Sequence, residues 1–598
     1  MKEKLRSEIE EKYKWDLTAI YSSDEEWQKD YDEIKNNLSS LGKYRGHIMD
    51  SAKTLFDMTQ CYFNISRKVE KVFIYAHLSC DAETSNTKYQ SYDGMVRNLY
   101  KDLGVVSSYI EPELLKNDYS KIEEYYEQVP ALLDYKNFFI EIFRYKDHVL
   151  SEKEEQILSK LSNVLSSSSN TYEKLTDTDL SLGVIIDEDN NEIELTDSNY
   201  SKYISSKDRR VRYDAFTAMY KAYGSVINTI ASTMYGEVNS NVALANLKNY
   251  NSAIEASLYS DNVNIDIYNN LIDTVSKNMD VLFKYYSLRK EVLGVKELHL
   301  YDLYADLIQS TEREYTFDEA KDIVLKALSP LGTDYIKDAN NAFSQRWIDI
   351  YPNKSKRSGA YSGGGYDTYP YMLLNFQGKI NDVSTFAHEL GHSMHSYYSR
   401  KNNTYQDSDY KIFVAEVAST VNELLLCNYL LKNTEDRDVK LSILNRLMEL
   451  FKGTIYRQSM FAEFEKDIYD MVEKDEVLTW ENISNHYYEL NKKYFGNGVV
   501  VDDDVKYEWA RIPHFYYYFY VYKYATGLSA ACYIVENILS GKEGALDSYL
   551  EFLKTGGKYY PLDELKIAGV DMTNPKVVES AINMFNETIN EFLNIYNN

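Results

Sequence analysis

The chain has 598 residues and a formal net charge of −27, with 44% hydrophobic and 27% charged residues. This composition is typical of a globular protein, and it excludes an intrinsically disordered chain. The length predicts at least two packed lobes, because a single hydrophobic core stops growing near about 250–300 residues. The negative charge argues against a nucleic-acid partner, because the phosphate backbone would be repelled.

The cysteines and the N-terminus predict a cytoplasmic protein with no membrane partner. Four scattered cysteines form no CxxC pair, so no disulfide framework is expected. Residues 1–15 lack the apolar segment of a secretory signal, and no run of about 18 apolar residues predicts a membrane span. The sequence does not predict the oligomeric state.

Long helices are expected because the chain contains only 8 prolines and 24 glycines. Residues 1–180 are predicted to be almost continuously helical. Ser23 is followed by Asp24, Glu25 and Glu26, and a serine before acidic residues predicts the N-cap of a helix. From Ser51 to Val69, apolar residues recur at spacings of three and four, which predicts one buried helix face. The fold class is therefore mainly α.

The pattern changes after Leu182. Residues 183–195 contain two short apolar runs around a polar turn and predict a β-hairpin. Thr196 is the expected cap of the next helix, and we place a domain boundary between residues 199 and 200. Helices are then predicted as far as the break at residues 330–332.

A second irregular stretch covers residues 351–378 and is rich in glycine. Within it, Pro370–Phe376 forms an apolar run that predicts a strand. We expect this strand to lie at the edge of a small sheet, where an extended peptide can pair with it through backbone hydrogen bonds. Helices are expected again from Asn381 to the C-terminus.

The most informative motif is His-Glu-x-x-His at His388, Glu389 and His392. Residues four apart lie on one face of a helix, so both imidazoles can bind the same Zn²⁺ ion. Glu389 can then reach a water molecule at the metal and act as a general base. The neighbouring residues are apolar or small, which predicts a largely buried helix.

A third metal ligand is expected on another helix, because a catalytic zinc site usually has three protein ligands and one open position. Glu416 lies in an apolar run 24 residues after His392, and a carboxylate there requires a partner. Ser419 and Glu423 lie on the same helix face and are candidates to hold a ligand histidine by its other ring nitrogen. His395 is expected to be a packing residue.

A third cluster lies near the C-terminus, where His514 is followed by a run of tyrosines. At helical spacing, Tyr517, Tyr520 and Tyr524 share a face. Imidazole and phenol groups can donate hydrogen bonds to the oxyanion of a tetrahedral intermediate. The candidates for this role are His514, Tyr520, Tyr522 and Tyr524, and a purely structural aromatic stripe is the alternative.

With these residues together, the sequence resembles the thimet oligopeptidase family of zinc metallopeptidases, and within it the oligoendopeptidase F group. The resemblance rests on residues 357–375, the segment from His388 to His395, residues 413–419 and residues 513–527. It implies a zincin-like helical ellipsoid of two lobes around a deep channel, with a small β element near the active site. It also implies an N-terminal helical domain of the oligopeptidase F type over residues 1–199 and a catalytic domain over residues 200–598.

By matching position, the resemblance implies one Zn²⁺ ion bound by His388, His392 and Glu416, with Glu389 as the base. His514 and the following tyrosines correspond to transition-state stabilisers. The implied activity is hydrolysis of internal bonds in short peptides. Two alternatives stay open: a zinc carboxypeptidase on a related helical scaffold, and a non-enzymatic peptide-binding protein with a structural zinc.

Overall fold

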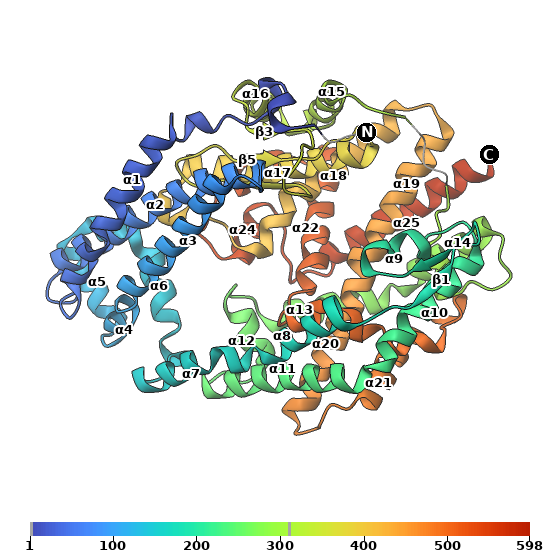
Figure 1. Ribbon diagram of the computed structural model, residues 1–598, viewed down its shortest axis with the longest axis horizontal. Coiled ribbons are helices and arrows are strands. Elements are labelled where there is room, and N and C mark those ends of the chain that lie inside the picture. The colour runs from blue at the N-terminus through green and yellow to red at the C-terminus, as the bar shows by residue number, and fades with distance from the viewer. Residues whose placement is uncertain (1–3, 309–312) are drawn as a thin grey trace. The chain divides into compact units, whose positions relative to one another are not determined.

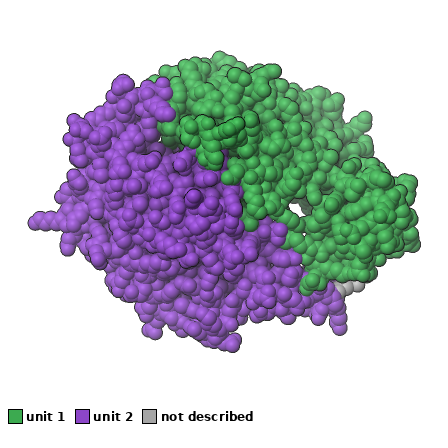
Figure 2. Space-filling model, turned by 180° about the vertical axis from the view of Figure 1, so that it is seen from behind, with its two compact units in different colours: residues 1–147, 313–429, 537–569 green, residues 148–312, 430–536, 570–598 purple. Residues whose placement is uncertain are grey.

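The computed structural model describes residues 4–308 and 313–598, and most of these residues are helical (Figure 1). This confirms the mainly-α fold class. The chain folds into two compact units, each built from three segments and coloured separately in Figure 2. Unit 1 contains residues 1–147, 313–429 and 537–569, and unit 2 contains residues 148–312, 430–536 and 570–598. The expected division after residue 199 stays a prediction about domain organisation.

Unit 1 combines helices with a small sheet. Its elements are α1 (Asp24–Asn37), α2 (Ala52–Ala82), α3 (Thr87–Ser107), α4 (Ile110–Leu115), α5 (Tyr119–Gln128), α6 (Lys136–Arg144), α15 (Phe317–Ala327), α16 (Thr333–Ser344), β3 (Ile348–Asp349), β4 (Tyr361–Gly363), β5 (Tyr371–Leu373), α17 (Ile380–Asn402), α18 (Ile412–Asn433), α23 (Ala545–Phe552) and α24 (Pro561–Ile567). The last residues of α18 belong to unit 2.

The described residues of unit 2 form helices and one hairpin. Its elements are α7 (Glu152–Leu165), α8 (Ser167–Lys174), β1 (Val184–Ile186), β2 (Glu192–Glu194), α9 (Asp197–Ile204), α10 (Arg209–Ser225), α11 (Ile227–Leu247), α12 (Ala253–Tyr259), α13 (Ile265–Lys277), α14 (Met279–Leu293), α19 (Arg437–Phe451), α20 (Arg457–Glu473), α21 (Trp480–Phe495), α22 (Tyr522–Leu539) and α25 (Lys576–Asn597). The last residues of α22 belong to unit 1. Four shorter turns are used below: the 3₁₀ helices η8 (Leu300–Tyr304), η13 (Asp503–Arg511) and η14 (Pro513–Tyr516), and the π-helical turn η11 (Lys452–Tyr456).

Local signals placed several element boundaries correctly. The hydroxyl groups of Ser23, Ser51 and Thr196 accept hydrogen bonds from backbone amides in the first turns of α1, α2 and α9. The predicted hairpin is present as β1 and β2, which pair antiparallel with Ile185 opposite Ile193. These features depend on neighbours a few residues away, which is why a sequence pattern reports them.

The sheet of unit 1 corrects the expected position of the edge strand. β5 lies in the centre, with β3 parallel on one side and β4 antiparallel on the other. All three residues of β5 are buried, and Tyr371 and Leu373 lie in the core that α1 and α2 also supply. The run Pro370–Phe376 therefore does not supply the edge, and the edge strand nearer in sequence to the glycine-rich stretch is β4.

The N-terminal helices and this sheet share one hydrophobic core. Trp27 of α1 and Val69 of α2 are completely buried in the same cluster as Tyr371 and Leu373 of β5. The hydroxyl of Tyr371 donates to the backbone carbonyl of Asp16, 2.7 Å away. The helices α1 and α2 thus pack against the sheet that α17 contacts through β4 and β5.

Candidate active site

The helix α17 carries the His-Glu-x-x-His motif in its middle. Phe386, Leu390 and Met394 are completely buried and fix the other face of the helix in the core. Asp382 accepts hydrogen bonds from the backbone amides of residues 377 and 379 and thereby orders the first turn. Because the three apolar side chains bury the opposite face of α17, His388 and His392 lie together on its more accessible face.

Three predicted ligand atoms converge between α17 and α18. The Nε2 atoms of His388 and His392 are 3.1 Å apart. Oε2 of Glu416 lies 3.4 Å from Nε2 of His388 and 3.5 Å from Nε2 of His392. All three ligand atoms lie within 4.8 Å of one another, so one metal ion can be bound between them. We call these three residues the metal cluster.

Glu423 orients the first histidine, as predicted. Its Oε1 atom lies 2.6 Å from Nδ1 of His388, which leaves Nε2 facing the cluster. Burial lowers the pKa of His388, but the hydrogen bond with Glu423 and the nearby carboxylates outweigh burial, so the pKa is raised overall. A carboxylate on the distal nitrogen also makes the imidazole a stronger metal ligand.

The expectations for Glu416 and Ser419 need correction in two details. The Glu416 side chain is 49% exposed rather than buried. Its hydrogen bond with His392 is the main cause that lowers its pKa to about 2, so it is a carboxylate throughout the physiological range. Ser419 does not hold a histidine: its hydroxyl lies 3.2 Å from Oε2 of Glu416 and 3.0 Å from the Glu416 carbonyl oxygen.

Two residues that set the spacing of α17 and α18 were missed from the sequence. A Cβ atom on Gly391 would lie 2.5 Å from Cα of Ser419 and 2.6 Å from the Ala418 carbonyl oxygen, so only glycine allows this approach. Asn422 is completely buried and donates from Nδ2 to the Ala387 carbonyl oxygen at 3.0 Å. A buried amide in an apolar helix is the signal that identifies such a contact.

Glu389 is more buried than the three residues of the metal cluster. It is 7% exposed, and burial is the largest cause that raises its pKa. The charges of His392 and His388 and the backbone amide of Ser362 in β4 oppose that rise. A carboxyl group with a raised pKa accepts a proton more readily near neutral pH, as a general base must.

His395 is a packing residue, as expected. It is completely buried and its ring stacks on Tyr410 at a centroid distance of 3.7 Å. Burial lowers its pKa to about 3, so the ring is neutral. It lies one turn beyond the metal cluster and does not belong to it.

The aromatic candidates lie in unit 2 and form a cluster of their own. The hydroxyl of Tyr524 is 3.5 Å from Nε2 of His514, and the rings of Tyr520 and Tyr524 are 5.3 Å apart. Burial lowers the pKa of His514, so this imidazole is neutral at pH 7. Tyr522 differs because it is completely buried and packs against Tyr268 at 5.0 Å. Their roles toward substrate stay a prediction.

The continuous helix expected over this cluster is not present. Residues 513–516 form the 3₁₀ helix η14, and α22 begins only at Tyr522. Between them, Tyr518 and Phe519 have φ angles of 49° and 57°, which are unusual for aromatic residues. Glu465 of α20 accepts a hydrogen bond of 2.6 Å from the Phe519 amide and holds this turn. Hydrophobic periodicity could not predict this contact, because Glu465 and Phe519 are 54 positions apart in the sequence.

No helix in the described part of the chain is long and apolar enough to cross a membrane.

Comparisons with known proteins identify the family of this chain. A model of peptidase family M3 matches residues 202–584, and a model of oligopeptidase F matches residues 113–181. Oligopeptidase PepF of Bacillus subtilis (strain 168) is 44% identical over 98% of this chain and 88% of its own length. The group B oligopeptidase PepB of Streptococcus agalactiae (serotype III, strain NEM316) is 40% identical over 99% of this chain and 98% of its own length.

A solved structure gives the same result. The crystal structure of oligoendopeptidase-F from Enterococcus faecium has a TM-score of 0.75 and 33% identity, covering 96% of this chain and 99% of that one. The matching models, the high coverage and the helix-borne metal cluster agree with one another. The chain therefore belongs to peptidase family M3, and it is a metallo-endopeptidase.

Proposed function

We propose that this protein is a zinc-dependent oligoendopeptidase that hydrolyses internal bonds of short peptides. The observation that carries the proposal is the convergence of His388, His392 and Glu416 within 4.8 Å, beside the buried Glu389. The names of the relatives, oligopeptidase and oligoendopeptidase, support the substrate class.

The residues of the metal cluster fit zinc. Two imidazole nitrogens and one carboxylate oxygen are typical of catalytic zinc sites, whereas Mg²⁺ and Ca²⁺ prefer oxygen ligands only. The contact from Glu423 leaves Nε2 of His388 available as a ligand atom. A bound zinc ion supplies a Lewis acid that polarises the scissile carbonyl and lowers the pKa of a water molecule toward about 7.

Glu389 is the group that moves the proton. Its carboxylate takes a proton from the attacking water and later donates it to the nitrogen of the leaving amine. Burial raises its pKa and so suits it to both steps. Its place directly after His388 on α17 keeps it beside the metal cluster.

His514, Tyr520 and Tyr524 are the proposed donors to the oxyanion of the tetrahedral intermediate. The neutral His514 ring and the tyrosine hydroxyls all carry polar hydrogens, and they already lie together in unit 2. Tyr522 is the weakest candidate because it is completely buried.

Strand β4 is the proposed pairing edge for the substrate backbone. It lies at the edge of the sheet, and its middle residue, Ser362, is next to Glu389. Backbone pairing binds peptides with little dependence on side chains, which suits an enzyme of broad specificity.

We also propose a cytoplasmic location, with no nucleic-acid or membrane partner. The support is the net charge of −27 and the four cysteines, which are all free thiols. Cell fractionation followed by immunodetection tests the location, and recovery in the membrane fraction would contradict it.

The proposed function is tested with peptides blocked at both ends and supplied together with an intact folded protein. Mass spectrometry is expected to show internal cuts confined to the short peptides, and Glu389→Gln is expected to lower kcat by roughly 10³-fold or more while keeping zinc. Tyr520→Phe and Tyr524→Phe are expected to lower kcat more than Tyr522→Phe. Peptides with proline in the segment that pairs with β4 are expected to be cut poorly.

Other outcomes select the alternatives. Cleavage only of peptides with a free C-terminus would indicate a carboxypeptidase. Peptide binding without cleavage by zinc-loaded protein would indicate a binding protein. Equal cleavage of proline-containing and control peptides would contradict the proposed pairing of the substrate backbone with β4.

A further inference from the structure

Unit 2 contains a pocket of about 280 Å³ that none of the proposed catalytic residues lines. Its walls come from α10, α14, η8, α19, η11, α20, α21 and η13, all in unit 2. The volume is close to the lower end of the range of small-molecule sites, about 300–1,000 Å³. We call it the unit 2 pocket.

Most of the unit 2 pocket is apolar or aromatic. Leu282, Leu303 and Met460 supply aliphatic surface, and Tyr286 and Phe495 supply flat rings that contact each other at 5.5 Å. Tyr286 is only 2% exposed, and among the described residues none hydrogen bonds with its hydroxyl. Such walls accommodate a compact hydrophobic body and one polar contact.

One end of the pocket is charged and has an excess of donors. Lys452 makes a hydrogen bond of 2.7 Å with Glu449, which uses one of its three N–H groups. Arg457 makes its two hydrogen bonds with Glu508, at 2.8 and 3.4 Å, which leaves three N–H groups without a partner among the described residues.

The carboxylates at this end are already occupied. Glu508 also accepts hydrogen bonds from Tyr220 at 3.0 Å and from Tyr487 at 2.7 Å. Glu449 also accepts from Arg289 at 2.7 Å. Arg289 does not line the pocket, but it shares Glu449 with Lys452, so the charge of Lys452 is only partly balanced and an anionic group can bind beside it.

A π-helical turn places the cations there. η11 interrupts the run from α19 into α20, and such turns often occur at functional sites. Lys452, Gly453 and Tyr456 of η11 and Arg457, the first residue of α20, all line the pocket. A Cβ atom on Gly453 would meet no heavy atom within 4 Å, so the backbone here borders open space.

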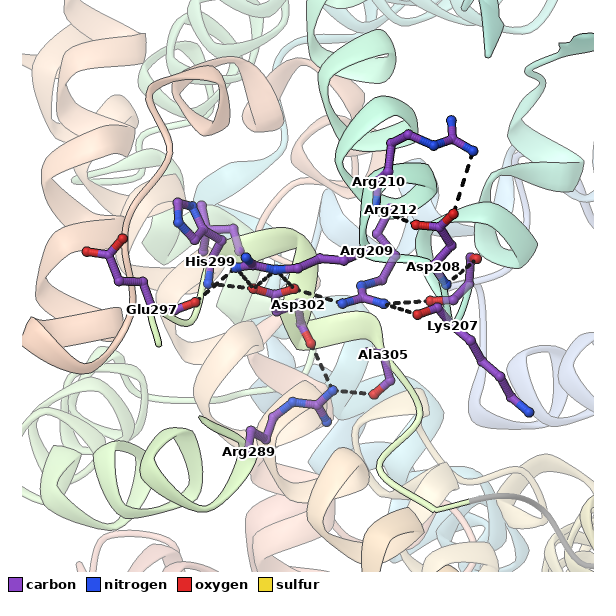
Figure 3. Close-up of polar contacts among 12 residues, drawn as sticks. Lys207, Asp208, Arg209, Arg210, Arg212, Arg289, Glu297, His299, Asp302 and Ala305 are labelled. Atoms are coloured by element: carbon purple, nitrogen blue, oxygen red, sulfur yellow. Dashed lines mark hydrogen bonds and ion pairs between the residues drawn. The ribbon is translucent and has the colours of Figure 1, made fainter. Parts of the chain in front are cut away.

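A second network of polar contacts holds η8, which also lines the pocket (Figure 3). Asp302 in η8 forms ion pairs with Arg209 at 2.7 Å and Arg212 at 2.9 Å. Arg289 donates to the backbone carbonyl oxygens of Asp302 and Ala305. Leu300 and Tyr304 in the same turn line the pocket, so its shape is fixed before any ligand binds.

From these contacts we propose that the unit 2 pocket binds a small organic carboxylate with an aromatic or aliphatic body. The carboxylate lies between Lys452 and Arg457, and the body packs against Leu282, Met460 and the Tyr286 ring. The ligand binds without chemical change. This site is independent of the proposed peptidase mechanism.

The test uses the zinc-loaded, full-length protein and 3-phenylpropanoate as the probe. Isothermal titration is expected to show one bound equivalent outside the metal cluster. The neutral 3-phenylpropanamide has the same shape and is expected to bind at least about 10-fold more weakly, because it lacks the charge. Lys452→Met is expected to weaken carboxylate binding to a similar extent, since Glu449 keeps Arg289 as its partner.

Gly453→Leu fills the open space and is expected to abolish binding while hydrolysis of a blocked peptide persists. Gly94→Leu, in α3 of unit 1, is the matched control, because a Cβ atom there also meets no atom within 4 Å. Lack of binding to the parent protein, or equal binding of acid and amide, overturns the proposal. Binding that persists in both pocket variants and competes with peptide substrate places the acid at the metal cluster instead and also overturns it.

Discussion

The geometry of the metal cluster depends on single residues that do not themselves bind metal. Gly391 lets the backbone of α18 approach α17, and Asn422 bonds the two helices together. Glu423 then orients His388, and Ser419 contacts the Glu416 carboxylate. The ligands are therefore held by contacts behind them, which explains why side chains from two helices meet at distances suited to one ion.

Replacing Gly391 with alanine is expected to separate α17 from α18 and weaken zinc binding. The added methyl group would meet backbone atoms at 2.5 and 2.6 Å, and backbone cannot rotate away as a side chain can. Overpacking of this kind costs about 1–3 kcal/mol. We expect zinc affinity to fall at least about 10-fold, measured by competition with a chromogenic chelator.

A matched substitution separates this effect from helix propensity. Gly94→Ala also replaces a helical glycine, but no atom lies within 4 Å of the new Cβ atom. It is expected to keep zinc affinity and to gain about 0.5–1 kcal/mol of stability. Unchanged zinc affinity in Gly391→Ala would contradict the role assigned to the close helix contact.

At the scale of elements, the turn before α22 is held by a buried carboxyl. Glu465 is completely buried, and its Oε1 atom accepts a hydrogen bond from the Phe519 amide. Burial raises the pKa of Glu465 to about 8. The group therefore stays protonated at neutral pH and supports the left-handed turn that follows His514.

This raised pKa predicts how stability depends on pH. An exposed glutamate in the unfolded chain titrates near its ordinary value of 4.5, whereas Glu465 in the folded protein titrates near 8. Between these values the folded state binds one more proton, so its stabilising contribution is complete below pH 4.5 and is lost as the pH rises to 8. The slope from this group is up to about 1.4 kcal/mol per pH unit.

Glu465→Gln is expected to remove this slope, as measured by urea unfolding from pH 5 to 8. Glu564 provides the comparison, because burial also raises its pKa to about 8 and it lies in unit 1. Glu564→Gln should remove a similar slope without changing peptide cleavage, whereas Glu465→Ala should also lower kcat by disturbing the turn. Parallel pH profiles for the parent and Glu465→Gln would contradict the buried, protonated state.

At the scale of the whole molecule, the two compact units are interleaved along the sequence. Unit 1 is built from three segments of the chain, and its core joins Trp27 and Val69 to Tyr371 and Leu373. Each buried side chain of this kind contributes about 1.5–3 kcal/mol. The framework under α17 is therefore completed by residues more than 270 positions away from the sheet.

The fragment 200–598 alone is consequently expected to lose the native packing of unit 1. It should bind 1-anilinonaphthalene-8-sulfonate and fail to retain zinc, because the β5 face that packs against α1 and α2 becomes exposed. Co-expression with residues 1–199 as a separate chain is expected to restore zinc binding. A zinc-loaded, active 200–598 fragment would contradict this dependence.

The sequence by itself determined the features that rest on local spacing. The mainly helical class, the caps at Ser23 and Thr196, the hairpin and the face shared by His388 and His392 all follow from contacts within a few residues. Glu416 was identified through the cost of a carboxylate in an apolar run, although its side chain is half exposed in the structure. The position of Glu416 in the sequence thus identified it as a ligand candidate, but the apolar run did not show how exposed its side chain is.

Only the tertiary structure decided which of these groups meet. It placed β5 in the centre of the sheet and β4 at its edge, and it broke the expected helix at Tyr518 and Phe519. It also revealed the unit 2 pocket, whose charged end is built from α19, η11, α20 and η13. Strand order, a turn held by Glu465 and a pocket all depend on contacts between residues far apart in the chain, and hydrophobic periodicity carries no information about such contacts.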